Sequence, residues 1–136
     1  MSGMPLTASL LKLRPFWLAC GAGFIVLVIY LSLMRNPIQA PVWFNFKIGH
    51  MLAYGWLMFW YLQIYRRWTQ RAAIAAALCL MGVALEYAQG MTGYRDFAYS
   101  DMRDNAMGVA IGLSFALTPF RDTLLFVEST TLGSRR

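Results

Sequence analysis

FWLACGAGFIVLVIYLSLM, residues 16–34, is a run of nineteen residues without one charged side chain. A transmembrane helix needs about 20 mainly apolar residues to cross the hydrocarbon core of a bilayer. The apolar core of a signal peptide is shorter, about 7–15 residues, and a small-x-small cleavage pattern follows it. Here the run leads into Met34-Arg35-Asn36-Pro37 instead. This stretch therefore predicts a membrane-spanning helix that is retained.

The rest of the chain has the same apolar character. Of its 136 residues, 59% are hydrophobic and only 13% are charged, whereas an average soluble domain is about 25% charged. Three more apolar stretches follow, separated by turn-forming or polar segments. We therefore expect an all-α protein, a four-helix transmembrane bundle with spans at 16–34, 44–65, 72–89 and 105–120. The expected domains are an N-terminal lead (1–15), the transmembrane domain (16–120) and a polar tail (121–136).

The distribution of arginine and lysine predicts how this bundle is oriented. With four spans, one side receives eight of these residues and the other receives four. Cytoplasmic loops usually carry the excess of basic residues, so both termini are expected in the cytoplasm and the protein in a bacterial inner membrane. The richer side holds Lys12, Arg14, Arg66, Arg67, Arg71, Arg121, Arg135 and Arg136, and the poorer side holds Arg35, Lys47, Arg95 and Arg103.

Composition also argues against several other classes of protein. The net charge of +6 does not indicate a nucleic-acid partner, because the basic residues lie between apolar segments and form no contiguous patch. Cys20 and Cys79 lie inside apolar stretches without a CxxC pattern, so we expect buried free thiols and no zinc site. No cofactor is expected. Glu86, Asp101 and Asn105 offer oxygen ligands of the kind that Mg²⁺ or Ca²⁺ prefers, which leaves a metal-assisted site as an alternative.

Polar side chains gather at one side of the expected bundle, the side that faces away from the cytoplasm. Charged or polar groups inside membrane segments are costly unless they are paired or serve a function. Residues spaced three or four apart share one face of a helix, and this spacing recurs on three successive spans. The set comprises Lys47, His50 and Tyr54 on the second span, Glu86 and Gln89 on the third, Arg95 in the loop that follows, and Asp101 and Asn105 at the start of the fourth.

Each of these residues also has a structural interpretation. For Lys47 and Arg95 it is extension to lipid headgroups, and for His50 it is a hydrogen bond between helices. For Glu86 it is an ion pair with Lys47 or with Arg95, whose glycine-rich loop can fold back over it. The other interpretations are a helix cap for Asp101 and Asn105, and close helix packing for Gly108-xxx-Gly112.

The order and spacing of these residues resemble the VanZ-like family of small helical membrane proteins. The resemblance covers roughly residues 43–115 and rests on Lys47-x-x-His50-x-x-x-Tyr54, Glu86-x-x-Gln89, Arg95, and Asp101-x-x-x-Asn105-x-x-Gly108-x-x-x-Gly112. The chain differs from the family pattern at two places. Phe46 stands where an acidic residue often precedes the lysine, and Gly93 stands near the place of a loop proline.

The resemblance implies a cell-envelope protein linked to resistance to the glycopeptide teicoplanin. We expect an outward-facing polar pocket that binds or acts on a lipid or peptidoglycan precursor, alongside contacts with membrane lipids. Glu86, Asp101 and His50 are the candidate catalytic acids and bases, and the candidate ligand-binding residues are Lys47, Tyr54, Gln89, Arg95 and Asn105. A non-catalytic binding or shielding protein and a small ion- or proton-coupled carrier are the alternatives. The sequence does not indicate an oligomeric state.

Overall fold

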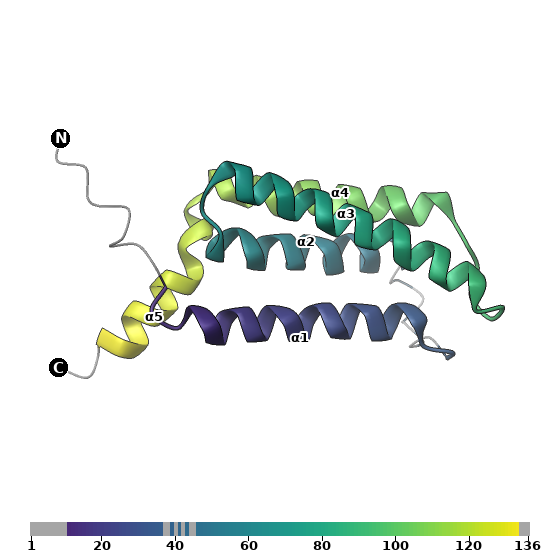
Figure 1. Ribbon diagram of the computed structural model, residues 1–136, viewed down its shortest axis with the longest axis horizontal. Coiled ribbons are helices and arrows are strands. Elements are labelled where there is room, and N and C mark those ends of the chain that lie inside the picture. The colour runs from purple at the N-terminus through teal and green to yellow at the C-terminus, as the bar shows by residue number, and fades with distance from the viewer. Residues whose placement is uncertain (1–10, 37–38, 40, 42, 44–45, 134–136) are drawn as a thin grey trace.

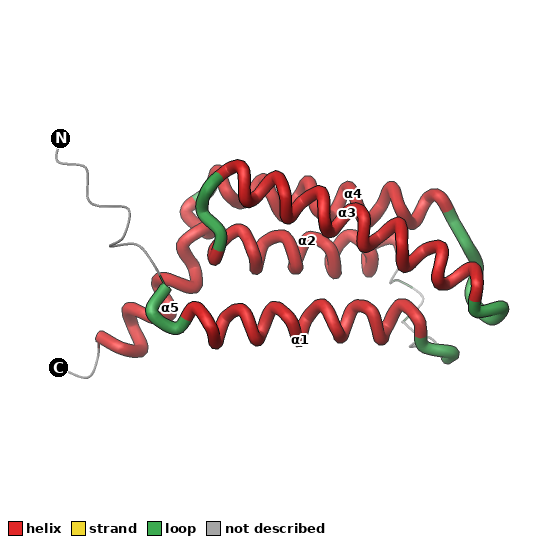
Figure 2. The backbone as a smooth tube through the Cα atoms, viewed as in Figure 1, coloured by secondary structure: helices red, strands yellow, loops and turns green. Residues whose placement is uncertain are grey.

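The computed structural model describes residues 11–36, 39, 41, 43 and 46–133, and this part of the chain is all-helical, as predicted. Most of the expected N-terminal lead, much of the connection at 37–45 and the last three residues lie outside the described residues. The helices, shown in Figures 1 and 2, are α1 (Arg14–Leu33), α2 (Phe46–Ile64), α3 (Trp68–Met91), α4 (Tyr99–Ser114) and α5 (Thr123–Gly133), with the short 3₁₀ helices η2 (Phe115–Leu117) and η3 (Pro119–Asp122) between the last two.

Helices α1 to α4 run side by side, and α2 packs against the other three (Figure 1). The core between them contains Tyr54, Leu57, Met58, Leu62, Leu78, Val109 and Ala116. Helix α5 lies at one end of the bundle, and we call this the α5 end. The loop between α3 and α4, residues 92–98, lies at the opposite end, which we call the loop end (Figure 2).

Two of the described helices, α1 and α3, are each long and apolar enough to cross a membrane. Helix α4 with η2 forms a third candidate only when it is joined to η3 and α5, and the two parts are bent by 83°. The expectation of four spans is thus supported for two helices, or three with the bent pair. Helix α2 falls short because its 19 residues include Lys47, His50 and Gln63.

Two of the predicted helix starts are wrong. Helix α4 begins at Tyr99, six residues before the expected start at Asn105, because the extended backbone of Ala98 is followed directly by helix with Asp101 in its first turn. An acidic residue there stabilises the positive end of the helix dipole. Helix α3 begins at Trp68 instead of residue 72. In the polar tail, for which no helix was predicted, residues Thr123–Gly133 form α5.

The end of α2 is capped by Arg71 of α3, whose side chain is buried. Its Nε and Nη2 groups both donate to the carbonyl of Leu62, at 3.1 and 2.9 Å, and Nε also donates to the carbonyl of Tyr65 at 3.1 Å. The last carbonyls of a helix lack partners inside that helix. Arg71 therefore caps the end of α2, a structural role beyond the topological one expected from the sequence.

Helix α4 and α2 approach each other most closely at two glycines. A Cβ atom at Gly108 would lie 2.8 Å from the Cα of Met51, and one at Gly112 would lie 2.9 Å from the Cβ of Met58. Gly112 also faces the carbonyl of Gly55, so residue numbers rise together along the two helices and they run parallel. No side chain larger than hydrogen fits at either position without separating the helices.

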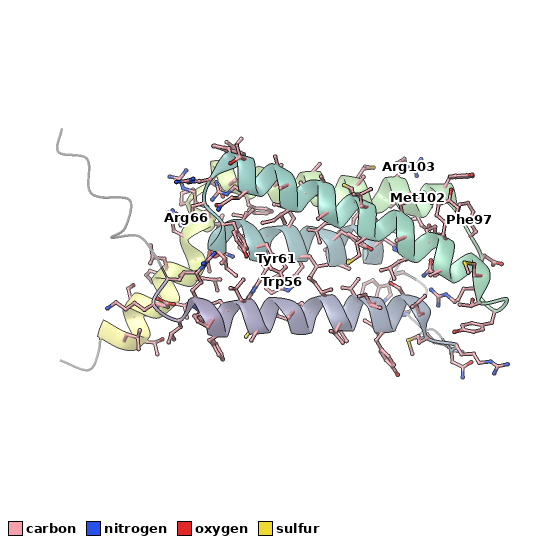
Figure 3. The ribbon with its side chains drawn as sticks, viewed as in Figure 1. Trp56, Tyr61, Arg66, Phe97, Met102 and Arg103 are labelled. Atoms are coloured by element: carbon pink, nitrogen blue, oxygen red, sulfur yellow. The ribbon has the colours of Figure 1, made fainter. Side chains whose placement is uncertain are left out.

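Helix α1 is the least enclosed of the four. Its one buried position is Gly21, where a Cβ atom would lie 2.8 Å from the hydroxyl oxygen of Tyr61. Tyr61 and Trp56 project from α2 into the space beside α1 (Figure 3). The outward face of α1 exposes Phe16, Val26, Leu27 and Tyr30. A helix with so much exposed apolar surface fits a lipid environment.

Helix α5 is tied to the start of α1 by Glu128, which is 4% exposed. One carboxylate oxygen accepts the backbone N–H of Lys12 at 2.8 Å, and the other accepts the N–H of Leu13 at 2.8 Å and the indole N–H of Trp17 at 2.7 Å. The first N–H groups of a helix have no partners within it. Glu128 thus supplies acceptors for the chain entering α1 from more than a hundred residues away.

Candidate functional site

Three helices bring polar side chains together near the loop end. Helix α2 contributes His50 and Tyr54, α3 contributes Glu86, and α4 contributes Asp101 and Asn105, and we call these five residues the polar cluster. His50 Nε2 lies 3.5 Å from Asp101 Oδ2, and the two side chains are 21% and 26% exposed. This pair joins α2 to α4: His50 directly precedes Met51, which contacts Gly108, and Asp101 lies seven residues before Gly108.

Glu86 is the most deeply buried charged residue of the cluster, at 1% exposed. Its Oε1 atom accepts the backbone N–H of Ala98 at 2.6 Å. The loop between α3 and α4 does fold back over Glu86, but it makes contact through this backbone group. The expected ion pair with Arg95 is absent among the described residues. Arg95, His50 and Asp101 act on the Glu86 carboxylate through longer-range electrostatic interactions.

Tyr54 and Asn105 meet against α3 at a glycine. A Cβ atom at Gly82 would lie 3.0 Å from Asn105 Nδ2 and 3.4 Å from Tyr54 Cε1. Gly82 is one turn before Glu86 on the same face of α3, so the small residue makes room for two polar side chains beside the carboxylate. Asn105 is 3% exposed, and its Oδ1 atom has no hydrogen-bond partner among the described residues. It lies within α4, so it is not the helix cap that was one interpretation.

The sequence analysis missed Asp104, which is 3% exposed. Its Oδ1 atom accepts from Arg103, with Nη2 at 3.2 Å and Nε at 3.3 Å, while Oδ2 has no partner in the described part of the chain. Arg103 itself lies at the surface near the loop end (Figure 3). The available signal was the i, i+4 spacing from Asp104 to Gly108, which puts both on the face of α4 that packs on α2.

Two of the expected ligand-binding residues lie apart from the cluster's centre. Gln89 donates from Nε2 to the carbonyl of Ser32 at 2.7 Å, and nearby the hydroxyl of Tyr94 donates to the carbonyl of Leu33 at 2.7 Å. Both bonds tie α3 and its loop to the last carbonyls of α1. Gln89 therefore has a structural contact where a ligand contact was expected. Lys47 is exposed in the first turn of α2, one turn before His50.

The donor set was tested for a metal ion. Within residues 11–36, 39, 41, 43 and 46–133, no three His, Cys, Asp or Glu side chains are close enough to share one ion. Among the expected oxygen ligands, Glu86 and Asp101 are separate carboxylates, and Asp101 faces His50 instead. Cys20 and Cys79 are free and half-buried. The set Glu86, Asp101 and Asn105 contains only two side chains of these types, so the metal-assisted alternative stays a prediction.

The chemistry that the cluster offers is that of acids, bases and hydrogen-bond acceptors. A carboxylate beside one ring nitrogen of histidine orients the imidazole, and Asp101 Oδ2 lies 3.5 Å from His50 Nε2. Glu86 keeps a second oxygen beyond the one bound to Ala98. These groups suit proton transfer to or from a bound polar molecule, and Arg95 adds positive charge at the same end.

Comparison of the chain with protein-family models, with curated proteins and with solved structures finds no match. The assignment of a role to the polar cluster therefore depends on its own geometry.

Proposed function

We propose that this chain is a VanZ-like integral membrane protein of the bacterial inner membrane, and that its polar cluster faces the periplasm or cell exterior. There it binds or acts on an envelope component, a lipid or a peptidoglycan precursor. A link to teicoplanin resistance follows from the family resemblance alone. In this proposal α1 to α4 form the four-helix bundle and both ends of the chain are cytoplasmic.

The observation that carries the proposal is the His50–Asp101 pair at 3.5 Å beside the buried carboxylate of Glu86. Three helices each contribute a titratable side chain to one small region of an otherwise apolar bundle. Such groups are costly in a membrane and are usually retained for a function. Packing alone does not require a histidine, two carboxylates and an asparagine to meet at the same end.

The charge distribution supports the proposed orientation. Six basic residues of the described chain lie at the α5 end, against two acidic ones. The loop end has four of each sign. Basic residues accumulate on the cytoplasmic side of membrane proteins, so the polar cluster belongs on the outer side.

Within this function, Arg95 and Lys47 hold an anionic group of the ligand, either phosphate or carboxylate. Arginine suits this role because its planar guanidinium binds two oxygens at once. His50, oriented by Asp101, and Glu86 then exchange protons with the bound molecule. Arg95 is available for this because it forms no ion pair with Glu86 in the described structure.

A non-catalytic binding or shielding protein is the second candidate, and two atoms favour it. Asp104 Oδ2 and Asn105 Oδ1 are buried acceptors without partners among the described residues. A buried acceptor without a donor costs about 1–3 kcal/mol, and a ligand with hydroxyl or ammonium groups would supply the donor. The carrier alternative is less favoured, since the buried polar side chains near the α5 end, Gln63, Arg71 and Glu128, are all hydrogen-bonded.

The test compares Glu86→Gln with Asp96→Asn in a strain that lacks the native gene. Glutamine keeps an oxygen for the Ala98 N–H and should leave the fold intact, while Asp96→Asn makes the same charge change at an exposed loop position. Lipid and muropeptide profiles, with teicoplanin susceptibility, are the readouts. A catalytic role predicts that only Glu86→Gln resembles the deletion. If Glu86→Gln gives the wild-type profile and His50→Ala gives the profile of the deletion, the cluster binds its ligand without catalysis by Glu86.

A further inference from the structure

Helix α5 lies across the α5 end of the bundle, at a steep angle to the helices that run along it. The segment from Pro119 to Gly133 is bent by 83° from the segment that contains α4. With 11 residues, α5 is about 16 Å long, too short to cross a hydrocarbon core of about 30 Å. If α3 crosses the membrane, α5 lies close to the membrane plane.

Several contacts fix α5 in this orientation. Leu124 packs with Leu11, Trp60 and Ile64 in a second small core. Its backbone N–H donates to Gln63 Oε1 at 2.8 Å. The three bonds to Glu128 and an ion pair of 2.6 Å between Arg66 and Asp122 add to this attachment. The face that α5 turns outward is therefore determined by the fold (Figure 3 shows Arg66 at this end).

Helix α5 buries a carboxylate and exposes large apolar side chains. Its most buried polar residue is the carboxylate Glu128, while Phe126 is 67% exposed. In the short helices before α5, Phe120 is 61% and Leu117 is 76% exposed, and Trp68 at the start of α3 is 55% exposed. Large apolar side chains held outward are favoured only if lipid covers them. Tryptophan at this level fits the membrane interface.

The same end of the molecule is strongly basic. Lys12, Arg14 and Arg67 are exposed there, and Arg14 is positioned over the ring of Tyr65 at 5.1 Å. The two acidic residues at this end already have partners, Asp122 in an ion pair with Arg66 and Glu128 in three hydrogen bonds. Excess positive charge therefore faces outward beside the apolar side chains of α5.

We propose that the α5 end is a binding surface for anionic phospholipids. Helix α5 lies in the interface with Phe120 and Phe126 among the upper acyl chains, and Arg14 and Arg67 hold phosphodiester headgroups. Exposed aromatic side chains beside cations are what an interfacial helix needs to bind an anionic leaflet. This inference depends on the membrane placement proposed above, and it is independent of what the polar cluster does.

The position of α5 is measured with a nitroxide at Phe126→Cys, in protein reconstituted into nanodiscs and with Cys20 and Cys79 replaced by alanine. The reference is Asp96→Cys in the exposed loop. The Phe126 label should be accessible to oxygen and protected from a water-soluble nickel complex, and the reference label should behave in the opposite way. A water-accessible Phe126 label overturns the proposal, as does dipolar broadening showing that a second copy of the chain covers this site.

Lipid selectivity is measured by native mass spectrometry in mixed phosphatidylglycerol and phosphatidylcholine. The double variant Arg14→Gln, Arg67→Gln is compared with Arg35→Gln, Arg103→Gln, which removes the same charge at the loop end. Each cation near an anionic surface contributes about a fivefold preference, so the first variant should lose most of its preference for phosphatidylglycerol and the second should keep it. If both double variants keep the preference for phosphatidylglycerol, or both lose it, the site is not at the α5 end.

Discussion

Replacing Glu128 by glutamine tests the polar contact with the longest sequence separation in the part of the chain that the structure describes. In the native protein one carboxylate oxygen accepts from Leu13 and Trp17, and the other accepts from Lys12. Glutamine has a single oxygen, so one of these bonds is lost, and the remaining two change from charged to neutral acceptors. A hydrogen bond to a charged group contributes about 1.5–3 kcal/mol and a neutral one about 0.5–1.5. The expected loss of unfolding free energy is therefore about 3.5–6 kcal/mol.

The assay is SDS-induced unfolding of the purified protein in mild detergent, followed by tryptophan fluorescence. The matched control is Asp122→Asn, which removes a carboxylate beside α5 but weakens only partly exposed ion pairs, with Arg66 at 2.6 Å and with Arg121 at 3.6 Å. Each pair should contribute no more than about 1 kcal/mol. If Glu128→Gln destabilises the protein no more than Asp122→Asn does, the assignment of Glu128 as the anchor of α1 is wrong.

The same contact predicts a pH dependence. Burial raises the pKa of Glu128, but the hydrogen bonds from Leu13, Trp17 and Lys12 outweigh it and leave the pKa below its ordinary value of about 4.5. A carboxylate with a lowered folded-state pKa stabilises the protein fully above its unfolded-state pKa. The stability difference between wild type and Glu128→Gln should therefore be constant near neutral pH and shrink as the pH falls below about 4.5. A difference that grows in acid contradicts this sign.

Three further outcomes are expected. Gly108→Ala should destabilise the protein by about 1–3 kcal/mol because its methyl group overlaps the α2 backbone. The control Gly23→Ala, with open space around it, should be neutral or stabilising. Equal effects of the two variants on the free energy of unfolding would contradict the close contact. Arg95→Ala should keep wild-type thermal stability and lose the envelope phenotype, and rescue of that phenotype by adding Glu86→Gln would end the ligand-binding role. A cysteine replacing Asp96 should react with an impermeant maleimide on intact spheroplasts; reaction only after permeabilisation would reverse the proposed topology.

The all-helical architecture was predictable because hydropathy is a local property. Residues 16–34 and 72–89 needed no partners to be identified as helices, and α1 and α3 are the two that meet the requirements for a span. Helix α2 was also expected to be a span, but its hydropathy is lower than that of α1 and α3 because it contains Lys47, His50 and Gln63. It packs against the other three helices, so its place in the bundle depends on these contacts and not on hydropathy alone.

The meeting of His50, Glu86 and Asp101 was also expected, because helical spacing fixes which side chains share a face. What holds Glu86 was not predictable. Arg95 carries the charge that suggests an ion pair, yet the donor is the backbone N–H of Ala98, and every non-proline residue has such a group. Asp104 was overlooked for a related reason, since its burial depends on how closely α4 approaches α2.

The α5 end was the least predictable part. The sequence predicted only a polar tail there and no helix, but the hydroxyls of Ser129 and Thr130 donate to backbone carbonyls one turn earlier within α5. Glu128 contacts Leu13 across a separation of 115 residues. A local sequence pattern cannot predict a contact between residues so far apart in the chain. Leu124 and Trp60, which belong to the second small core, also hold α5 at this end of the bundle.

The Glu128 contact also has a consequence for the order of events during synthesis. Trp17 leaves the ribosome 111 residues before Glu128 does, an interval of about 6–20 s at usual elongation rates. Throughout that time the N–H groups at the start of α1 lack their final acceptor. Helices α2, α3 and α4 can assemble around their shared core, and Gln89 can bind the end of α1, before α5 is made. The start of α1 is therefore secured last, and only a chain translated through residue 128 can complete this contact.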